Sequence, residues 1–252
     1  MVMRLVQVKV KEGRLGDMQQ HYAQRIIPAL ESVQGCRYAG LMRSVHNSEE
    51  CLSLTLWDSE QHAQDYERSG LFEILLEETR PYLLESSESK LQLSEDLTLQ
   101  YVPIPADPVV SKHPVALRSD TLAPQQERQG PMWVRIVSLK LRQGRRAEFE
   151  KLYRDQVIPT LRGVKGCRYI YLTERTDRED EVLSVTSWER KEDAQAYEES
   201  GLFARLLESQ SDALSDLYHW KLDEQKKKGA MSATSDDPTI EQFDVVAGKA
   251  FR

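Results

Sequence analysis

The sequence has few of the residues that build disulfide frameworks, metal sites or nucleotide sites. Its 252 residues include only three cysteines, and an odd number of that size does not make a disulfide framework. The cysteine and histidine spacings of zinc sites are missing, and so are the glycine-rich motifs that bind nucleotide phosphates. We therefore expect no metal, no cofactor and a reducing, cytoplasmic location.

Long apolar runs and an excess of basic charge are also lacking. No run approaches the roughly 18 apolar residues of a membrane helix, and we read no signal peptide at the N-terminus. Lys and Arg number 34 against 41 Asp and Glu, which gives a net charge of −7. The field of such a chain has the wrong sign for nucleic acid or an anionic membrane. We expect neither as a partner.

What the sequence does contain is an internal repeat. Residues 3–83 align with residues 134–214 at a constant offset of 131 and without gaps, with 32 identities in 81 positions. A period this long is not that of a solenoid and indicates two copies of a compact unit. We assign the first domain to residues 1–102 and the second to residues 132–252, joined by a proline-rich linker over residues 103–131.

Each copy shows the same order of predicted elements. Residues 5–11, like their counterparts in the second copy, alternate with a period of two and predict a strand. Apolar residues at three-to-four spacing from Met18 to Val33 predict a helix. Two strands, a helix broken by glycine and a last strand follow, the last over residues 97–102 in the first copy and 243–250 in the second. The polar stretch over 223–238 reads as a mobile loop.

The order β-α-β-β-α-β is that of the ferredoxin-like unit, so the predicted class is α+β with tandem ferredoxin-like domains. Helices cover only one face of such a sheet, and the other face needs a cover. In the first strand that other face carries Leu5, Gln7 and Lys9, which is mixed rather than fully charged. We therefore expect the two copies to pack sheet against sheet as an intramolecular pseudo-dimer, which could in turn form a homo-oligomer.

Two motifs recur almost unchanged in both copies. The first, I-P-x-L-x-x-V-x-G-C-R-Y, covers residues 27–38 and 158–169, and the second is L-S-x-T-x-W-(D/E)-x-x-x-x-A-Q-x-Y-x-x-S-G-L-F. These motifs resemble the antibiotic biosynthesis monooxygenase (ABM) family of dimeric α/β barrels. The resemblance implies a small-molecule partner, since the family holds cofactor-independent oxygenases of aromatic polyketides or quinol-like compounds, heme-degrading enzymes and members without known activity.

The resemblance also implies a cavity between helices and sheet, lined by the Trp that ends the third strand. A buried Trp at a strand end serves packing equally well, and Tyr, with a usual pKa near 10, is a poor base at neutral pH. A Tyr hydroxyl in a cavity could still donate to a substrate oxygen. The candidate substrate-binding residues are Trp57, Tyr66, Tyr22, Trp188, Tyr197 and Tyr153.

Histidine is a better base, and of the five histidines only His21 is placed for that role. It precedes Tyr22 on the first helix, and its counterpart Leu152 indicates a half-buried position. If His21 is a catalytic base, only the first copy is active. The alternative is a structural histidine.

The heme-degrading branch of the family uses an Asn, a Trp and a His, and none of these types is present at the matching positions. Those positions hold Val6, Tyr66 and Leu76 in the first copy and Val137, Tyr197 and Leu207 in the second. The favoured function is therefore a cofactor-independent monooxygenase acting on a small aromatic or quinol-like substrate. Two alternatives stay open: a non-catalytic ligand-binding or structural protein, and heme binding without the usual residues.

Overall fold

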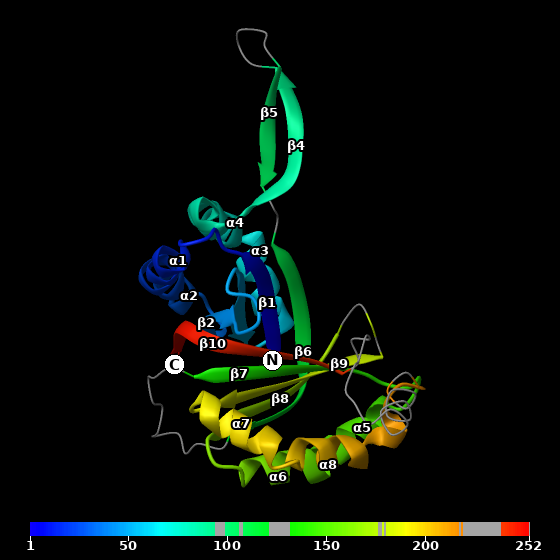
Figure 1. Cartoon of the computed structure of the whole chain (residues 1–252). Helices are drawn as coiled ribbons and strands as arrows, with labels where there is room; N and C mark the ends of the chain where they lie inside the picture. The colour runs from blue at the N-terminus through cyan, green and yellow to red at the C-terminus, as the bar shows by residue number, and fades with distance from the viewer. Residues whose placement is uncertain are drawn as a thin grey trace. The chain divides into compact units, whose positions relative to one another are not determined.

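The chain divides into two units, each of which combines distant parts of the sequence (Figure 1). The N-terminal unit comprises residues 4–111 and 246–252, and the C-terminal unit comprises residues 112–245 and 1–3. The computed structural model describes residues 1–93, 99–105, 108–120, 132–175, 178, 180–216, 218 and 238–251.

The elements predicted for the first copy are present in the predicted order. The last strand named here passes into the C-terminal unit from Lys112 onward. The elements are β1 (Val2–Lys9), α1 (Leu15–His21), η1 (Tyr22–Ile26), α2 (Ile27–Glu31), β2 (Cys36–Ser44), β3 (Glu50–Trp57), α3 (Glu60–Arg68), α4 (Leu71–Thr79), η2 (Arg80–Tyr82), β4 (Glu85–Leu93), β5 (Leu99–Pro105) and β6 (Val109–Asp120).

The second copy repeats this order from its first strand to η4, the counterpart of η2. Its last strand passes into the N-terminal unit from Val246 onward. The elements are β7 (Trp133–Lys140), α5 (Arg146–Leu152), η3 (Tyr153–Val157), α6 (Ile158–Arg162), β8 (Cys167–Glu174), β9 (Glu181–Trp188), α7 (Lys191–Glu199), α8 (Leu202–Ser209), η4 (Ser211–Ala213) and β10 (Thr239–Ala250).

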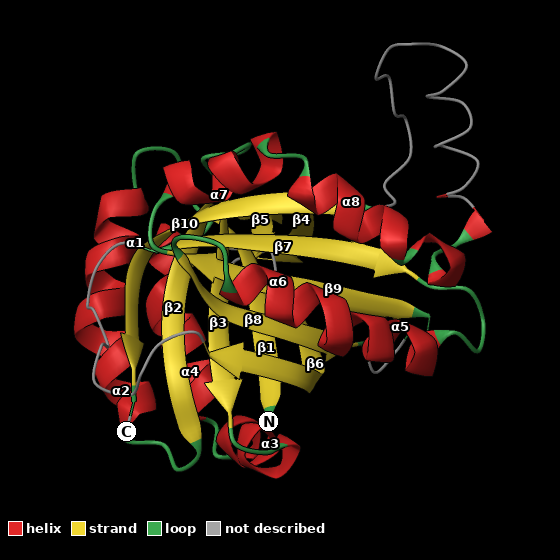
Figure 2. Ribbon diagram, turned by 90° about the horizontal axis from the view of Figure 1, so that it is seen from below, coloured by secondary structure: helices red, strands yellow, loops and turns green. Residues whose placement is uncertain are grey.

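The sheet of the C-terminal unit has the strand order β10-β7-β9-β8-β6. Its pairs are antiparallel, with Trp133 of β7 opposite Trp188 of β9, and β10 pairs with β7 from Thr239 to Asp244. The predicted closing strand over 243–250 therefore exists and begins four residues earlier. Helices α5 to α8 lie over one face of β7, β8 and β9 (Figures 1 and 2), which is the ferredoxin-like arrangement.

The N-terminal unit contains the corresponding strands β1-β3-β2, and β2 is followed in the order by β10. Near the end of the chain, the Phe251 N–H donates to the Arg37 carbonyl at 2.8 Å. The prediction that residues 97–102 close the first sheet is wrong. The described residues of that segment, 99–102, lie in β5, and β5 pairs with β4 in a separate two-stranded sheet.

The segment predicted as a linker, 103–131, contains a strand. Val109–Asp120 forms β6 and pairs with β8 from Val115 to Asp120, and the Val115 N–H donates to the Met1 carbonyl at 3.1 Å. Pro114 lies just before the pairing begins, where a residue without an N–H costs no ladder hydrogen bond. Residues 106–107 and 121–131 lie outside the described residues, as does 223–237 of the predicted polar loop.

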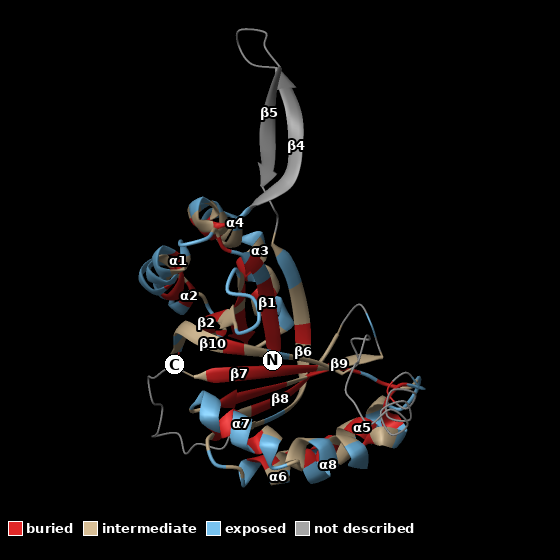
Figure 3. Cartoon of the chain, in the orientation of Figure 1, coloured by how far each residue is buried: buried red, intermediate tan, exposed pale blue. Residues whose placement is uncertain are grey.

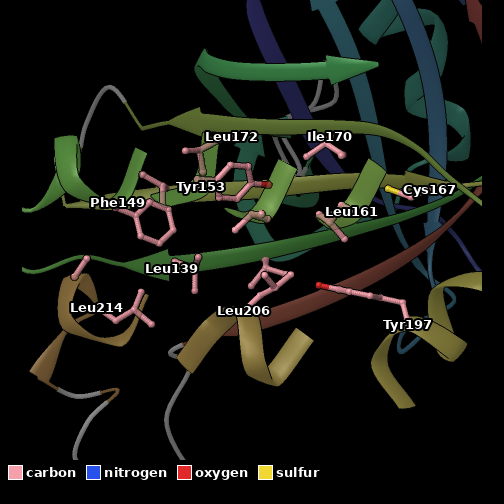
Figure 4. Close-up of a cluster of buried hydrophobic side chains, with 14 of the residues drawn as sticks. Leu139, Phe149, Tyr153, Leu161, Cys167, Ile170, Leu172, Tyr197, Leu206 and Leu214 are labelled. Atoms are coloured by element: carbon pink, nitrogen blue, oxygen red, sulfur yellow. The ribbon is translucent and has the colours of Figure 1, made fainter. Parts of the chain in front are cut away.

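The core of the C-terminal unit lies between its helices and its sheet. Phe149 and Leu161 from the helices pack with Leu139, Ile170 and Leu172 from the strands (Figure 4). Strands β7 and β8 are largely buried, whereas the outer sides of α6 to α8 are exposed (Figure 3). A matching core in the N-terminal unit uses equivalent residues. The predicted α+β class and the tandem ferredoxin-like domains are confirmed, and two such units in one chain are what an intramolecular pseudo-dimer requires.

One π turn interrupts the first helix of each copy. The Ile27 N–H donates to the Tyr22 carbonyl, and the Ile158 N–H donates to the Tyr153 carbonyl. Pro28 and Pro159 lie in the first turn of the short helices that follow, directly after the π turn. The turn also sets the direction of the tyrosine that begins it.

Candidate functional site

A cavity of about 30 Å³ lies in the C-terminal unit between the helices and the sheet. One water-sized group needs roughly 10–15 Å³, so the cavity holds about two of them. Sites for drug-sized ligands are about 300–1,000 Å³. This cavity is therefore too small for such a ligand and admits only small groups. Its lining residues are Arg135, Val137, Leu139, Tyr153, Val157, Leu161, Ser184, Thr186, Tyr197, Phe203, Leu206, Leu207 and Gln210.

Arg135 is the cationic residue of the lining, and it is 2% exposed. It lies on β7 two residues before Val137, so strand alternation turns it toward the helices. Its Nε donates to the Glu198 carboxylate at 2.5 Å. The guanidinium carbon lies 4.1 Å from the Phe203 ring centroid and 5.9 Å from that of Tyr197. Its Nη2 is buried and has no hydrogen-bond partner among the described residues.

Tyr153 enters the cavity from the π turn. Its hydroxyl lies 2.7 Å from the Ser184 hydroxyl on β9, and either group could be the donor. Burial raises the pKa of Tyr153 far above its usual value near 10, and the hydrogen bond from Ser184 opposes that shift only in part. Tyr153 therefore stays a neutral phenol and cannot serve as a base at neutral pH.

Tyr197 of α7 is the second tyrosine of the cavity, and its ring packs against that of Trp188. The two rings lie 5.1 Å apart, and the Trp188 indole N–H donates to the Thr186 hydroxyl at 3.0 Å. Trp188 is fully buried and does not line the cavity, whereas the Tyr197 hydroxyl points toward Leu206 (Figure 4). Burial raises the pKa of Tyr197 to about 12, although the nearby Arg135 charge works against it.

The N-terminal unit repeats these contacts almost atom for atom. Arg4 donates through Nε to Glu67 at 3.0 Å, lies 4.2 Å from the Phe72 ring centroid, and has a buried Nη2 without a partner among the described residues. The Tyr22 hydroxyl lies 2.8 Å from that of Ser53.

The Trp57 and Tyr66 rings complete the repeated contacts. Their centroids lie 5.0 Å apart and the rings are stacked, whereas Trp188 and Tyr197 lie 5.1 Å apart and are tilted by 30°. The tryptophan and tyrosine candidates of the sequence are thus brought together in each unit, with both tryptophans in the packing position behind the tyrosine. Their part in substrate binding stays a prediction.

His21 stands apart from the repeated contacts. It ends α1, its Nε2 lies 3.4 Å from the Thr79 hydroxyl, and its ring lies 5.2 Å from that of Tyr82. Burial lowers the pKa of His21 below 6.5, while the Glu78 carboxylate works in the other direction. A neutral imidazole at pH 7 is the form that a base needs. A catalytic role for His21 stays a prediction.

The residues that the structure describes hold no cluster of three or more His, Cys, Asp or Glu that could bind a metal. The three positions matched to the heme-degrading branch, Val137, Tyr197 and Leu207, all line the cavity. Cys36 and Cys167 are buried and are not in a disulfide, and burial raises the pKa of each to about 12.

Sequence reasoning missed the Arg–Glu pair. Arg4 and Arg135 each open an apolar strand, where a charged residue suggests a solvent-exposed end. Two signals were available in the sequence. Each arginine lies two residues before the helix-facing valine of its strand, so the two side chains share one face of the sheet. In addition, both the arginine and its glutamate are identical in the two copies.

Comparison with known families identifies one family model, antibiotic biosynthesis monooxygenase, which matches residues 1–75 and 132–209. The match covers both copies and more than half of the chain. No curated protein matches the chain. Among the described residues, no helix is long and apolar enough to cross a membrane.

Solved structures show the same fold at low sequence identity. A protein described as a proposed monooxygenase from Fusobacterium nucleatum has a TM-score of 0.67 at 8% identity, over 99% of this chain and 94% of that one. Another, from Lactobacillus acidophilus, has a TM-score of 0.62 at 6% identity, over 100% and 99%. An anthrone oxidase-like protein has a TM-score of 0.52 at 12% identity, over 99% and 92%. At such identities the likeness concerns the fold alone.

Proposed function

The chain belongs to the antibiotic biosynthesis monooxygenase family, and from this premise we propose that it is a cofactor-independent monooxygenase acting on a small aromatic or quinol-like substrate. The observation that carries the proposal is the cavity of the C-terminal unit, which is largely apolar and lined by two neutral tyrosines. Such a lining suits a flat, electron-rich ring that must be kept away from water.

The reaction needs no electron donor besides the substrate. An electron-rich ring gives four electrons to O₂, one oxygen atom enters the product as a hydroxyl or a carbonyl group, and the other leaves as water. A hydroquinone becomes a hydroxyquinone in this way, and an anthrone becomes a quinone. The protein has to bind the ring, hold its oxygen and exclude water.

The residues of the cavity supply these functions. Tyr197, whose pKa is raised to about 12, keeps its proton and can donate a hydrogen bond to the substrate oxygen. Tyr153 is held by Ser184 and fixes one wall of the cavity. The side chains of Val137, Leu139 and Val157 are apolar and offer water no hydrogen-bond partner in the cavity.

An aromatic substrate needs more than the present volume of about 30 Å³. The wall that has to move comes from α8, which contributes Phe203, Leu206 and Leu207. This short helix begins at Leu202, directly after Gly201, whose φ of 69° separates it from α7. Movement of one short helix to admit the substrate and to close over it is a common device of enzymes that exclude water.

The proposal is tested by oxygen uptake with purified, metal-free full-length protein and a panel of hydroquinones and anthrones. Uptake above the spontaneous rate is expected for at least one compound. Tyr197→Phe should lower kcat/KM about tenfold, because one hydrogen bond to the substrate oxygen is lost. Tyr169→Phe, on β8 and outside the cavity lining, is the matched control and should retain the activity.

A second candidate function is favoured by the small volume of the cavity. In a non-catalytic protein of this fold, side chains fill the pocket. A remaining volume of about 30 Å³ means that the pocket of this chain is almost filled. Oxygen uptake no higher than in buffer for every compound, together with unchanged melting temperature on adding them, would support this reading against the monooxygenase.

A further inference from the structure

The buried arginine of the cavity has more hydrogen-bonding capacity than the protein uses. A guanidinium is always charged and carries five N–H donors. In Arg135 the Nε group is satisfied by Glu198 at 2.5 Å, whereas Nη2 has no partner among the described residues although the side chain is nearly inaccessible. A buried donor without a partner loses the hydrogen bonds it would make in water, which is costly for a charged group.

Glu198 accepts a hydrogen bond from Arg135 and also accepts one from a second residue. Gln242 of β10 donates through Nε2 to the same carboxylate at 3.2 Å. The Phe203 ring lies under the guanidinium at 4.1 Å and supports the cation through its π face. These contacts fix the guanidinium rigidly beside the cavity, and none of them uses the Nη2 group.

The cavity is large enough for the hydrogen-bond acceptor that Nη2 lacks. A volume of about 30 Å³ holds two water-sized groups, which is the size of one carboxylate or of a ring oxygen with its neighbour. The rest of the lining is apolar or hydroxyl-bearing apart from the Gln210 amide, so no carboxylate of the lining competes for the guanidinium at this side.

From this geometry we propose that Arg135 is an anion-binding residue whose Nη2 donates to a negatively charged oxygen of the ligand. The ligand of the C-terminal unit is then an aromatic compound that enters as a carboxylate or an ionised phenol. This inference rests on the proposed function and deepens it by naming the charge of the substrate, and the binding step it describes does not depend on oxidation.

The same residue gives a reason why the cavity can work without a histidine. A guanidinium beside a phenol oxygen stabilises the phenolate and lowers the pKa of the bound phenol. The phenol loses its proton to water before it enters the cavity, and the guanidinium holds it there as the phenolate. Position 152, where the first copy has His21, is Leu in the C-terminal unit.

The experiment is a binding titration of the full-length protein with benzoate and with benzamide, its neutral analogue of the same shape, by isothermal titration calorimetry. Benzoate has no group that the proposed reaction oxidises, so binding is measured apart from activity. Benzoate should bind about 10- to 100-fold more tightly than benzamide, the range expected for a hydrogen bond to a charged group. Equal affinity, or no binding of benzoate at millimolar concentration, would overturn the proposal.

Two variants locate the effect. Arg135→Met fills the space of the side-chain stem without the charge and should abolish the preference for benzoate. Arg162→Met, on the exposed end of α6, removes the same charge from the same unit and should keep the preference. If Arg135→Met does not fold, Arg135→Lys retains the charge but not the guanidinium, and it should lower the affinity for benzoate at least tenfold. A preference for benzoate that survives in Arg135→Met, or an unchanged affinity for benzoate in Arg135→Lys, would refute the assignment.

The outcome separates this inference from the monooxygenase proposal. Benzoate binding that depends on Arg135, without oxygen uptake for any compound, would leave an anion-binding protein and remove the oxygenase. Oxygen uptake without any preference for benzoate would keep the oxygenase and remove the anion site.

Discussion

The two units keep one set of contacts and differ in the residues next to it. In both, a buried Arg donates to a Glu, a Tyr hydroxyl lies within hydrogen-bond distance of a Ser hydroxyl, and a Trp ring packs against a second Tyr. The differences lie at His21, which corresponds to Leu152, and at Thr79, which corresponds to Gln210.

The residues that the two units share and those that differ suggest different roles. Binding of a ring beside a cation requires only residues that both units have. Proton abstraction by histidine at the position of His21 is open to the N-terminal unit alone. Gln210 donates to the Leu206 carbonyl at 2.7 Å, and Thr79 donates to the equivalent Leu75 carbonyl at 2.6 Å. The Thr79 hydroxyl differs in that it also lies 3.4 Å from His21 Nε2.

The largest effect is expected from the tryptophan that both units bury completely. Trp57→Ala and Trp188→Ala should each lower the free energy of unfolding of the unit concerned by about 3–5 kcal/mol, because a large cavity forms behind the stacked tyrosine. Urea denaturation followed by circular dichroism measures the loss. A loss below about 1 kcal/mol in either variant would show that this ring is not a core residue in that unit.

The next effect concerns a glycine in the left-handed region. Gly166 has a φ of 80°, and a Cβ built on it would lie 2.5 Å from the Asp193 carboxylate carbon. Gly144 has a φ of 76° with no atom within 4 Å of such a Cβ. Gly144→Ala should therefore lower the stability by about 1–2 kcal/mol for the backbone alone, and Gly166→Ala by clearly more.

Melting temperatures of the two variants, measured side by side, check this difference. Gly35→Ala should behave like Gly166→Ala, since its Cβ would meet the His62 ring. Equal melting temperatures for Gly144→Ala and Gly166→Ala would contradict the close packing of α7 on this turn.

A smaller effect is expected from the hydroxyl pair of the π turn. Ser184→Ala leaves the buried Tyr153 hydroxyl without its partner and should cost about 1–3 kcal/mol. Tyr153→Phe removes the buried polar group itself and should cost less, because Ser184 is only half-buried and can bind water. Ser53→Ala and Tyr22→Phe should show the same order in the N-terminal unit. The reverse order in urea denaturation would mean that the hydroxyl pair is not formed.

The smallest effect is a pH dependence confined to the N-terminal unit. Burial lowers the pKa of His21 in the folded state below its usual 6.5, so the unfolded chain binds more protons as the pH falls through 6.5. Stability is therefore complete above pH 6.5 and declines below it, until the pH passes the folded pKa. His21→Leu, which copies the second unit, should remove this part of the decline. An unchanged difference between wild type and variant from pH 7.5 to pH 5 would contradict it.

Much of the fold could be predicted from the sequence because the repeat reports each element twice. The alternation in the first strands and the stripe from Met18 to Val33 indicated their elements correctly. The closing strand of the first sheet could not be identified, since the pattern of a strand does not tell which partner it pairs with. Residues 97–102 and 109–120 are both extended in pattern, and the prolines at 108 and 114 favoured a linker over a strand for residues 109–120.

The candidate site was predicted in its aromatic part and missed in its charged part. Large apolar rings in a repeat indicate a core, and Trp188, Tyr197 and Tyr153 do lie together. Burial of Arg135 depends on Glu198 and Phe203, which are more than 60 residues away in the chain. Only the folded structure brings these three side chains together.

The activity proposed for this chain is the transfer of one oxygen atom from O₂ to an organic substrate without a cofactor. Reaction of the metal-free protein under ¹⁸O₂ with the best compound of the panel, followed by mass spectrometry of the product, tests it most directly. The account predicts one ¹⁸O atom in each product molecule, at a rate that Tyr197→Phe lowers. Product without ¹⁸O, or with the label at the spontaneous rate only, would contradict it.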